Sequence, residues 1–167
     1  SKMVKTLLDM SELQTIGRDE TIAVDALVDE VMVDLEPLAQ EKEIKLIGNC
    51  KDTTMVGSDI LIYRMVYNLV ENAIKYNHFG GQVTITAYRN GKNICLSVED
   101  TGSGIPAELK ERIFEPFFRV DKSRSRQLGG VGLGLALVHE IVRVHDGRIT
   151  VQSSPSGGTI FEIVFTQ

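Results

Sequence analysis

Two short alternating segments joined across Asn90-Gly91 constrain the fold of this 167-residue chain more than any other feature of its sequence. Residues 83–87 and 94–98 carry an apolar side chain at every second position, which is the pattern of a strand with one buried face. Asn-Gly between two such segments is the strongest short-range signal for a β-hairpin. The sequence therefore predicts an antiparallel sheet whose apolar face needs cover.

Amphipathic helices are predicted to supply that cover. Residues 59–77 carry the clearest helical stripe, whose apolar members are Ile62, Met65, Val66, Leu69, Ala73 and Ile74. Residues 25–42 are expected to form a second helix, with Asp25 as its N-cap. Pro37 is expected to kink this helix or to shift its register.

Two further helices and three further strands complete the predicted fold. Residues 3–14 form one amphipathic helix, and residues 132–146 form another that Gly147 stops. The strands are expected at residues 44–47, 149–151 and 160–165. The length fits a single core. The sum is an α/β two-layer sandwich, with about five strands in a mixed, mostly antiparallel sheet and about three helices on one face.

The acidic balance of the chain limits its ligands. The chain holds 23 Asp and Glu against 18 Lys and Arg, a net charge of -5, which argues against a general binder of nucleic acids or anionic membranes. Any anionic ligand must be held locally. Its 2 cysteines are too few for a disulfide framework or a four-ligand zinc site. Because no apolar run approaches roughly 18 residues and no signal peptide is evident, we expect a cytoplasmic location.

Three polar residues share one side of the helix predicted at 59–77. Asn68, Asn72 and Lys75 are spaced i, i+4 and i+7, so they project from one narrow face opposite the apolar stripe. Two carboxamide oxygens and an ammonium group suit a hydrated Mg²⁺ ion and the phosphates it bridges. A solvated helix face explains the same spacing, and on this helix alone the two interpretations stand equal.

A strand that ends in Asp100 leads into a turn containing Gly102 and Gly104. Asp100 can accept a hydrogen bond from an exocyclic amine, while glycines without side chains let a flat base approach the backbone. In isolation, an ordinary turn explains Asp-Thr-Gly better. An aspartic protease would need a second Asp-Thr/Ser-Gly, which the chain lacks.

Residues 129–135 are rich in glycine and precede a predicted helix, so their N–H groups can face an anion. The polar, basic residues 123–127 before them exclude the dinucleotide-binding fingerprint, and no Gly-Lys-Ser/Thr ending of a Walker loop is present. Residues 110–126 hold six basic side chains against three acidic ones. This segment fits a lid over a polyphosphate, although a solvated loop explains each single side chain as well.

Taken in chain order, these motifs resemble the catalytic, ATP-binding domain of sensor histidine kinases, in the superfamily that also holds gyrase B, Hsp90 and MutL. Residues 68–76 resemble the N box, 100–104 the first glycine box, 114–118 the F box and 130–135 the second glycine box. The similarity covers roughly residues 20–166. It implies a Bergerat-type fold, ATP and Mg²⁺ as ligands, and a protein-histidine kinase activity.

The resemblance also implies roles for single residues. Asn72 would bind Mg²⁺ with the help of Asn68, Lys75 would meet a phosphate, Tyr76 would pack on the adenine, and Asp100 would accept from its amino group. Thr159 would support Asp100 through water. Phe118 would anchor the lid, together with Phe117. The other residues implied to contact the nucleotide are Gly102, Gly104, Ile105, Lys122, Arg124, Gly130, Gly132, Leu133, Gly134 and Leu135.

One position departs from the wider superfamily. Gyrase-like and MutL-like ATPases carry a glutamate as general base one turn before the metal-binding asparagine, where this chain has Asn68. An amide cannot deprotonate water, so we expect ATP to be held without rapid hydrolysis, as suits phosphoryl transfer to an imidazole. Glu71 is a candidate to orient the acceptor, and a surface carboxylate is the alternative. Asn68, Glu71 and Lys75 are thus the expected catalytic residues.

The acceptor histidine is expected outside this chain, because none of His78, His139 and His145 lies in the family's acceptor sequence. Residues 1–16 resemble the end of the dimerisation and phosphoacceptor helix, and residues 17–167 the catalytic domain. The implied partners are that dimerisation domain and a response regulator, in a membrane-anchored homodimer with this domain on the cytoplasmic side. The alternatives are a nucleotide-gated binding module and a water-hydrolysing clamp ATPase.

Overall fold

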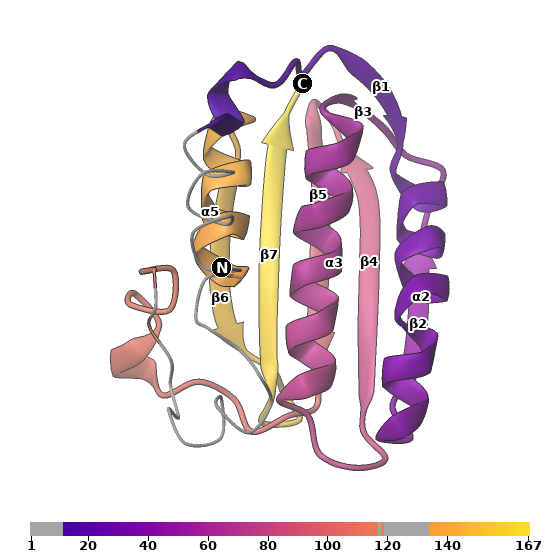
Figure 1. The fold of residues 1–167 in the computed structure, drawn as a ribbon, viewed down its shortest axis with the longest axis vertical. Helices are drawn as coiled ribbons and strands as arrows, with labels where there is room; N and C mark the ends of the chain where they lie inside the picture. Colours follow the sequence, from indigo (N-terminus) through magenta and orange to yellow (C-terminus); the bar gives the residue numbers. More distant parts are fainter. Residues whose placement is uncertain (1–11, 117, 119–133) are drawn as a thin grey trace.

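A five-stranded mixed sheet is covered on one face by the helices α2, α3 and α5 (Figure 1). The structure is a computed structural model that describes residues 12–116, 118 and 134–167. The helical elements are the 3-10 helices η1 (Leu13–Thr15) and η2 (Ala107–Leu109) and the α-helices α2 (Val24–Glu41), α3 (Asp59–Lys75) and α5 (Gly134–Val144). The strands are β1 (Glu20–Ala23), β2 (Lys45–Cys50), β3 (Thr54–Gly57), β4 (Gln82–Asn90), β5 (Asn93–Asp100), β6 (Arg148–Ser153) and β7 (Thr159–Thr166).

The sheet has the strand order β2-β4-β5-β7-β6. β2 pairs with β4 in parallel, and the other three pairs are antiparallel. The predicted hairpin is confirmed: Asn90 lies opposite Asn93, and Gly91 occupies the turn with φ 65°, a backbone region that glycine enters without steric cost. The predicted two-layer sandwich with a mixed, mostly antiparallel sheet is therefore confirmed.

The core lies between the sheet and the helix layer. All six stripe residues predicted for α3 are buried, and they face alternate residues of β4 and β5, such as Ile85 and Val98, which are also buried. The helix begins after Ser58, whose hydroxyl oxygen accepts a hydrogen bond from the N–H of Leu61 (3.3 Å). Packing of this one apolar stripe sets the orientation of the polar side of α3.

A small second sheet was not predicted. β1 and β3 pair in antiparallel register over four residues each. This pairing changes the start of α2, because the N–H of Val24 donates to the carbonyl oxygen of Thr53 (2.9 Å). The prediction of Asp25 as N-cap is therefore wrong. Ala23 is the N-cap residue, no side chain there makes a capping hydrogen bond, and Asp25 lies in the first turn of the helix.

Pro37 lies inside α2, which continues from Val24 to Glu41. Proline cannot donate to the carbonyl four residues earlier, and here that residue is Val33. The side chain of Val33 is 72% exposed, so this side of the helix faces water, which can hydrate the freed carbonyl group. The helix therefore continues past Pro37, because the missing hydrogen bond lies on its solvent-exposed side.

The end of α5 differs from the prediction in the residue that turns the chain. Asp146, not Gly147, adopts the left-handed conformation, with φ 57°, which aspartate tolerates better than most residues. Gly147 is needed for a different reason. A Cβ atom on it would lie 2.7 Å from the ring of Phe165 and 3.0 Å from the carbonyl oxygen of Val164, so glycine lets the chain pass directly over β7.

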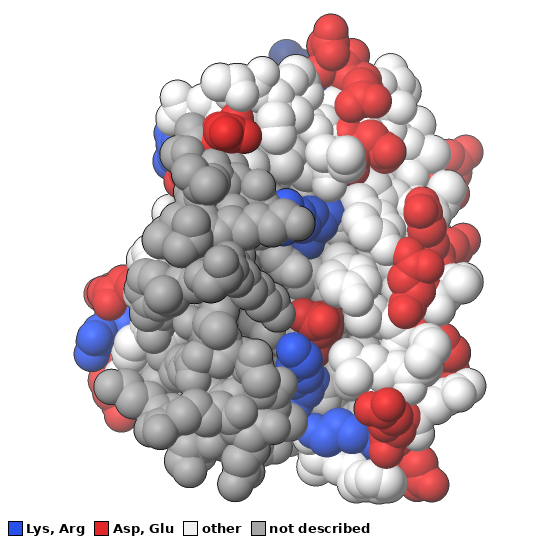
Figure 2. Space-filling view, in the orientation of Figure 1, with Lys and Arg blue, Asp and Glu red and all other residues white. Residues whose placement is uncertain are grey.

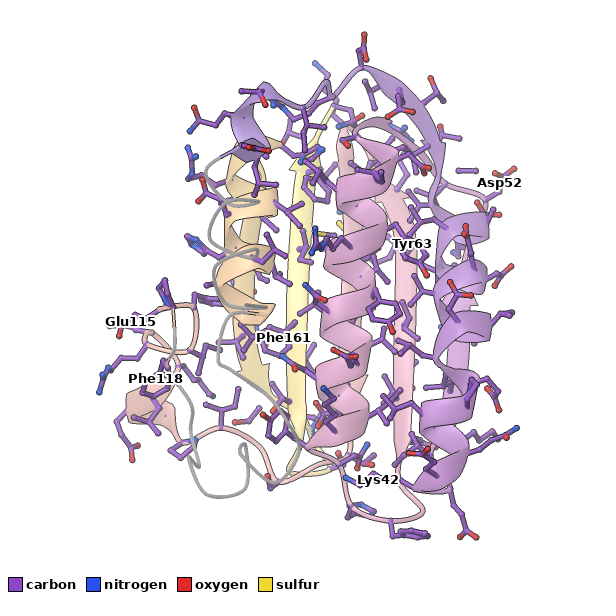
Figure 3. All side chains as sticks on the ribbon, in the orientation of Figure 1. Lys42, Asp52, Tyr63, Glu115, Phe118 and Phe161 are labelled. Atoms are coloured by element: carbon purple, nitrogen blue, oxygen red, sulfur yellow. The ribbon has the colours of Figure 1, made fainter. Side chains whose placement is uncertain are left out.

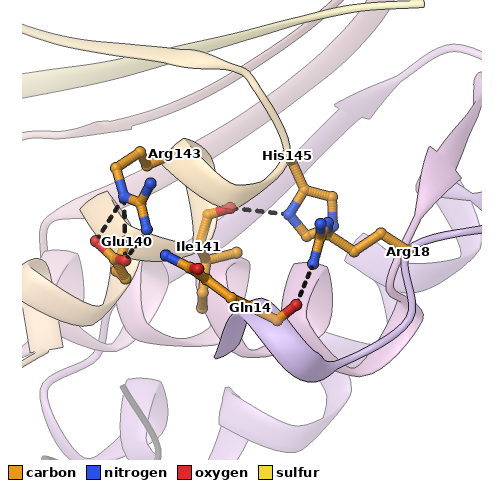
Figure 4. A network of polar contacts seen from close by, with 6 residues as sticks. All are labelled: Gln14, Arg18, Glu140, Ile141, Arg143 and His145. Carbon is orange, nitrogen blue, oxygen red and sulfur yellow. Dashed lines mark hydrogen bonds and ion pairs between the residues drawn. The ribbon is translucent and has the colours of Figure 1, made fainter. Parts of the chain in front are cut away.

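His145 follows α5 and connects it to the start of α3 by two hydrogen bonds, of which Figure 4 shows the one to Ile141. Its Nε2 atom accepts from the N–H of Ser58 (3.0 Å), so the ring proton is on Nδ1, which donates to the carbonyl oxygen of Ile141 (2.8 Å). Burial lowers the pKa of His145, and the nearby Arg18 lowers it further, while the Ile141 bond and Asp146 act in the opposite direction. The folded protein therefore favours the neutral ring.

Acidification should weaken this joint. Since the pKa of His145 is lower in the folded than in the unfolded chain, its contribution to stability is intact above about pH 6.5 and declines as the pH falls below that value. Protonation would place an N–H against the N–H of Ser58, and an unpaired buried donor costs about 1–3 kcal/mol. Urea unfolding at pH 7.5 and 5.5 should show a larger loss for the wild type than for His145→Gln, and parallel losses would contradict this role.

Candidate functional site

The polar side of α3 carries four predicted site residues. Asn68, Glu71, Asn72 and Lys75 are all half-buried, which places them at the border of the core and not on a fully solvated face. Lys75 and Glu71 form an ion pair (3.7 Å) one turn apart. Among the described residues, neither the Asn68 nor the Asn72 carboxamide has a hydrogen-bond partner. Half-buried amides without protein partners are available to a ligand.

The last turn of α3 is held from outside by Lys42, which follows α2. Its Nζ donates to the carbonyl oxygens of Lys75 (2.7 Å) and Asn77 (2.9 Å), with a longer contact to that of Ile74 (3.5 Å). Figure 3 shows Lys42 at this end of the helix layer. Helix ends leave carbonyl groups unpaired and carry partial negative charge. A cation here therefore fixes the chain directly beside Lys75.

Asn77 connects the end of α3 to the end of β5. It is 1% exposed, and its Nδ2 donates to the carbonyl oxygen of Gln82 (3.1 Å). Its Oδ1 accepts from the hydroxyl of Thr101 (3.0 Å) and from the N–H of His78 (2.9 Å). The Thr101 hydroxyl in turn accepts from the N–H of Gln82 (2.9 Å). The residues after the N box and after Asp100 are thus bonded side chain to side chain.

Asp100 lies at the end of β5 and is half-buried. Its Oδ1 atom accepts from the N–H groups of Gly102 (2.8 Å) and Thr159 (3.3 Å). Burial raises the pKa of Asp100 and the charge of Glu99 adds to the rise, whereas the two hydrogen bonds oppose it. Both bonds end on Oδ1, so among the described residues Oδ2 keeps its capacity for a further donor.

Close backbone contacts around Asp100 require glycine. A Cβ atom on Gly158 would lie 2.0 Å from the carbonyl oxygen of Asp100, and one on Gly102 would lie 2.7 Å from that of Tyr76. Gly104 has φ 76°, and a Cβ there would lie 2.6 Å from the carbonyl oxygen of Gly157. These glycines bring the end of α3, the end of β5 and the start of β7 together.

The two predicted ends of the ligand site lie at the same end of the molecule. The N–H of Tyr76 donates to the carbonyl oxygen of Asn72 (3.1 Å), so these residues are one helical turn apart, about 6 Å along the axis. Tyr76 in turn is beside Gly102, which bonds to Asp100. Ile105, also half-buried, packs against the core next to this turn. The structure therefore brings the N box and the first glycine box together.

The turn between β6 and β7 supports Thr159 from behind. Ser154 is 5% exposed, and its hydroxyl donates to Oε2 of Glu99 (2.9 Å). The N–H of Ser154 donates to the carbonyl oxygen of Gly158 (3.0 Å). These hydrogen bonds fix the turn that carries Gly158 and Thr159, the two residues that contact Asp100. The sequence indicated the turn, but it gave no signal that Ser154 would be buried.

Aromatic residues attach the segment after η2 to the rest of the domain. The ring of Phe114 packs against those of His139 (5.3 Å between centroids) and Phe161 (6.3 Å), which agrees with a structural role for His139. The guanidinium of Arg112 lies over the ring of Phe118 (4.7 Å). Figure 3 shows Phe118 in the segment that projects beyond the edge of the sheet, and Phe161, a residue of β7, in the part of the view between α3 and α5.

Six predicted site residues fall outside the described residues: the lid residue Phe117, and the nucleotide-contacting residues Lys122, Arg124, Gly130, Gly132 and Leu133. The predicted helix 3–14 lies almost entirely outside them as well. Of the second glycine box, Gly134 is the first residue of α5, and a Cβ on it would meet nothing within 4 Å. Leu135 is half-buried and packs against the core. The described part thus presents open space at the start of α5.

Acidic side chains gather away from this site. All six charged residues within α2 are acidic, namely Asp25, Asp29, Glu30, Asp34, Glu36 and Glu41, and Figure 2 shows acidic side chains along that edge of the molecule. No helix in the described ranges is long and apolar enough to cross a membrane. The described residues also contain no group of three or more His, Cys, Asp and Glu side chains that could hold a metal ion.

Comparison with known sequences assigns the family. The pattern of histidine kinase-, DNA gyrase B-, and HSP90-like ATPases matches residues 57–167. The chain belongs to this family, and within it to the ATPase domains of two-component sensor histidine kinases. The chain is 39% identical over 165 residues to the sensor-like histidine kinase SenX3 of Mycobacterium tuberculosis, covering 96% of this chain and 40% of SenX3. It therefore spans well under half of that relative.

Solved structures of histidine kinases have the same fold as this chain. The catalytic domain of histidine kinase ThkA matches with a TM-score of 0.80 at 27% identity, over 90% of this chain and 96% of that one. ThkA in complex with response regulator protein TrrA matches with a TM-score of 0.82 at 26% identity, over 99% of this chain and 46% of ThkA. Full-length ShkA in complex with AMPPNP gives 0.83 at 25% identity, over 98% and 35%. The fold is thus the Bergerat-type ATP-binding fold.

Proposed function

We propose that this domain binds ATP with Mg²⁺ between α3 and the turn after β5, and that the γ-phosphoryl group passes to a histidine of the dimerisation domain in the whole protein. The observation that carries this proposal is the half-satisfied carboxylate of Asp100 beside the N box. A half-buried carboxylate with one oxygen hydrogen-bonded and the other available suits an exocyclic amine. The ATPase family and the AMPPNP complex of ShkA support the same ligand.

The base end of the proposed site is built around Asp100. Its Oδ2 accepts from the adenine amino group, and the N–H of Thr159 donates to Oδ1, in addition to the support through water that the resemblance implies for Thr159. Tyr76 packs on the base. Gly102 and Gly104 admit the base close to the backbone, and Ile105 lines the same turn. Phe118 anchors the segment that follows.

The phosphate end of the proposed site uses α3 and the start of α5. Asn72, with Asn68, holds Mg²⁺, and the fit is good because both supply carboxamide oxygens that no described protein group occupies. Lys75 and the N–H groups beside Gly134 meet phosphate oxygens. Leu135, and outside the described residues Lys122, Arg124, Gly130, Gly132 and Leu133, complete the set. When bound at these residues, Mg²⁺ would supply positive charge that offsets the negative charge of the phosphates.

The proposal favours phosphoryl transfer to protein over hydrolysis. Asn68 cannot act as a base toward water. Glu71 forms an ion pair with Lys75, and in this proposal its carboxylate orients the acceptor imidazole. We further propose that the phosphohistidine passes its phosphoryl group to an aspartate of a response regulator. The complex of ThkA with TrrA supports this kind of partner.

The rest of the protein is also part of the proposal. Residues 1–16 would end the dimerisation and phosphoacceptor helix, and residues 17–167 would form the catalytic domain. Leu13, within the first segment, is 1% exposed and packs in the core of the domain, so the two segments meet closely. As in sensor kinases generally, we propose a membrane-anchored homodimer with this domain in the cytoplasm and no role for nucleic acid.

The isolated 167-residue chain should bind ATP but retain no phosphate. Because it holds no acceptor histidine and Asn68 is no general base, incubation with γ-labelled ATP should give neither acid-labile protein phosphate nor rapid phosphate release. Malachite-green detection of phosphate and acid-sensitive labelling on gels measure the two outcomes. Multiple-turnover hydrolysis would instead indicate a clamp ATPase, and stable labelling of the chain would place the acceptor within it.

A further inference from the structure

Three residues outside the predicted ligand contacts hold the proposed base site together. Lys42, Asn77 and Thr101 form what we call the base-site clamp. Lys42 follows α2, Asn77 follows α3 and Thr101 follows β5, so the ends of three separate elements meet at the base-site clamp. The carbonyl oxygen of Lys42 also accepts from the N–H of Gly80 (2.9 Å), which ties the loop after α3 to the same residue.

The clamp fixes Tyr76 from both sides along the chain. Lys42 donates to the carbonyl groups of Lys75 and Asn77, the residues directly before and after Tyr76. The carbonyl group of Tyr76 itself lies against Gly102, where a Cβ atom would come within 2.7 Å. Tyr76 therefore sits on a segment of backbone that has little freedom to shift.

The clamp fixes Asp100 through its neighbour. Thr101 is bonded by its hydroxyl to Asn77 and to the N–H of Gln82, and its own N–H donates to the carbonyl oxygen of Gln82 (3.2 Å). Gly81 packs tightly against this pair: a Cβ atom on it would lie 2.3 Å from Oδ1 of Asn77 and 2.6 Å from the Thr101 hydroxyl. A displaced Thr101 would carry Asp100 with it.

We propose that Lys42, Asn77 and Thr101 are positioning residues for adenine recognition, which set the distance between Tyr76 and the carboxylate of Asp100. The inference rests on the proposed function, because it assumes that those two residues contact the base. The three clamp residues act through other groups and do not themselves touch the ligand. Lys42 and Thr101 are half-buried and Asn77 is buried, and a side-chain network whose members are hydrogen-bonded to one another in this way favours one geometry.

Replacement of Thr101 tests the proposal. Thr101→Val removes the hydroxyl that joins Asn77 to Gln82, whereas Thr101→Ser keeps it. We expect the dissociation constant for Mg-ATP, measured by calorimetry, to rise about tenfold in Thr101→Val and to change less than about threefold in Thr101→Ser. Lys42→Met should act in the same direction, and Lys51→Met, at an exposed lysine after β2, is the matched control.

The preference for ATP over GTP separates positioning from mere stability. A misplaced Asp100 should reduce this preference, whereas a general loss of stability would weaken the binding of ATP and GTP equally. Measurement at 10 °C keeps the variants folded, and circular dichroism checks this. If folded Thr101→Val keeps the wild-type preference for ATP, or if Thr101→Ser loses it equally, the positioning role is wrong. A wild-type chain that binds neither nucleotide would instead refute the proposed function.

Discussion

Replacing Asp100 by asparagine is expected to lower the affinity for ATP by about 1–3 kcal/mol, or roughly 5- to 150-fold, the cost of mispairing a buried polar group. The carboxylate accepts at both oxygens, whereas an amide has one oxygen and one NH₂. Since Gly102 and Thr159 both donate to Oδ1, the amide oxygen of the variant would turn toward them. Its NH₂ group would then face the adenine amino group, donor against donor.

The Asp100→Asn variant should lose binding without losing stability. Because the pKa of Asp100 is raised in the folded chain, its ionised form is disfavoured by folding, and this penalty is fully present above the raised pKa. A neutral amide avoids it, so the free energy of unfolding at pH 7 should not fall. Calorimetric titration, with Glu162→Gln as an exposed control, measures the affinity. Unchanged affinity for ATP would show that Asp100 does not read the base.

Gly158→Ala should damage both the fold and the site. The added Cβ would lie 2.0 Å from the backbone carbonyl oxygen of Asp100, and neither strand can move without breaking ladder bonds between β5 and β7. Overpacking against backbone costs about 1–3 kcal/mol or more, and we expect the upper part of that range together with loss of ATP binding.

Denaturant unfolding tests the Gly158 prediction. The control is Gly17→Ala, where the nearest atom to the added Cβ is a side-chain oxygen at 3.7 Å. That substitution should change the free energy of unfolding by less than about 0.5 kcal/mol. Equal stability of the two variants would mean that the turn before β7 does not pack on Asp100 as described.

The main elements of the fold could be predicted because their patterns are local. The stripe of α3 and the Asn90-Gly91 hairpin each specify an element within a few residues of sequence. The β1–β3 pair could not be predicted this way. Each strand has only four residues, and their pairing depends on how the start of α2 meets the loop before β3. The false N-cap at Asp25 has the same cause.

The residues of the candidate site that belong to a short sequence motif could be predicted. Asp100 and the N box stand out by residue type and spacing, and the structure places them at the same end of the molecule. Lys42 could not be found in this way, because it acts on backbone carbonyls 32 to 35 residues away. Its sequence surroundings look like an ordinary charged helix end. The role of Asp146 was hidden because Gly147, the usual turning residue, follows it.

Titration of the chain with a non-hydrolysable ATP analogue, with and without Mg²⁺, tests the central claim most directly. One carboxylate and two carboxamides at the same end of the molecule predict a single saturable site whose affinity rises when Mg²⁺ is present. Asp100→Asn should weaken binding in both conditions, and Asn72→Ala should remove the gain from Mg²⁺. Binding that is absent, or that neither Mg²⁺ nor these substitutions affect, would contradict the account.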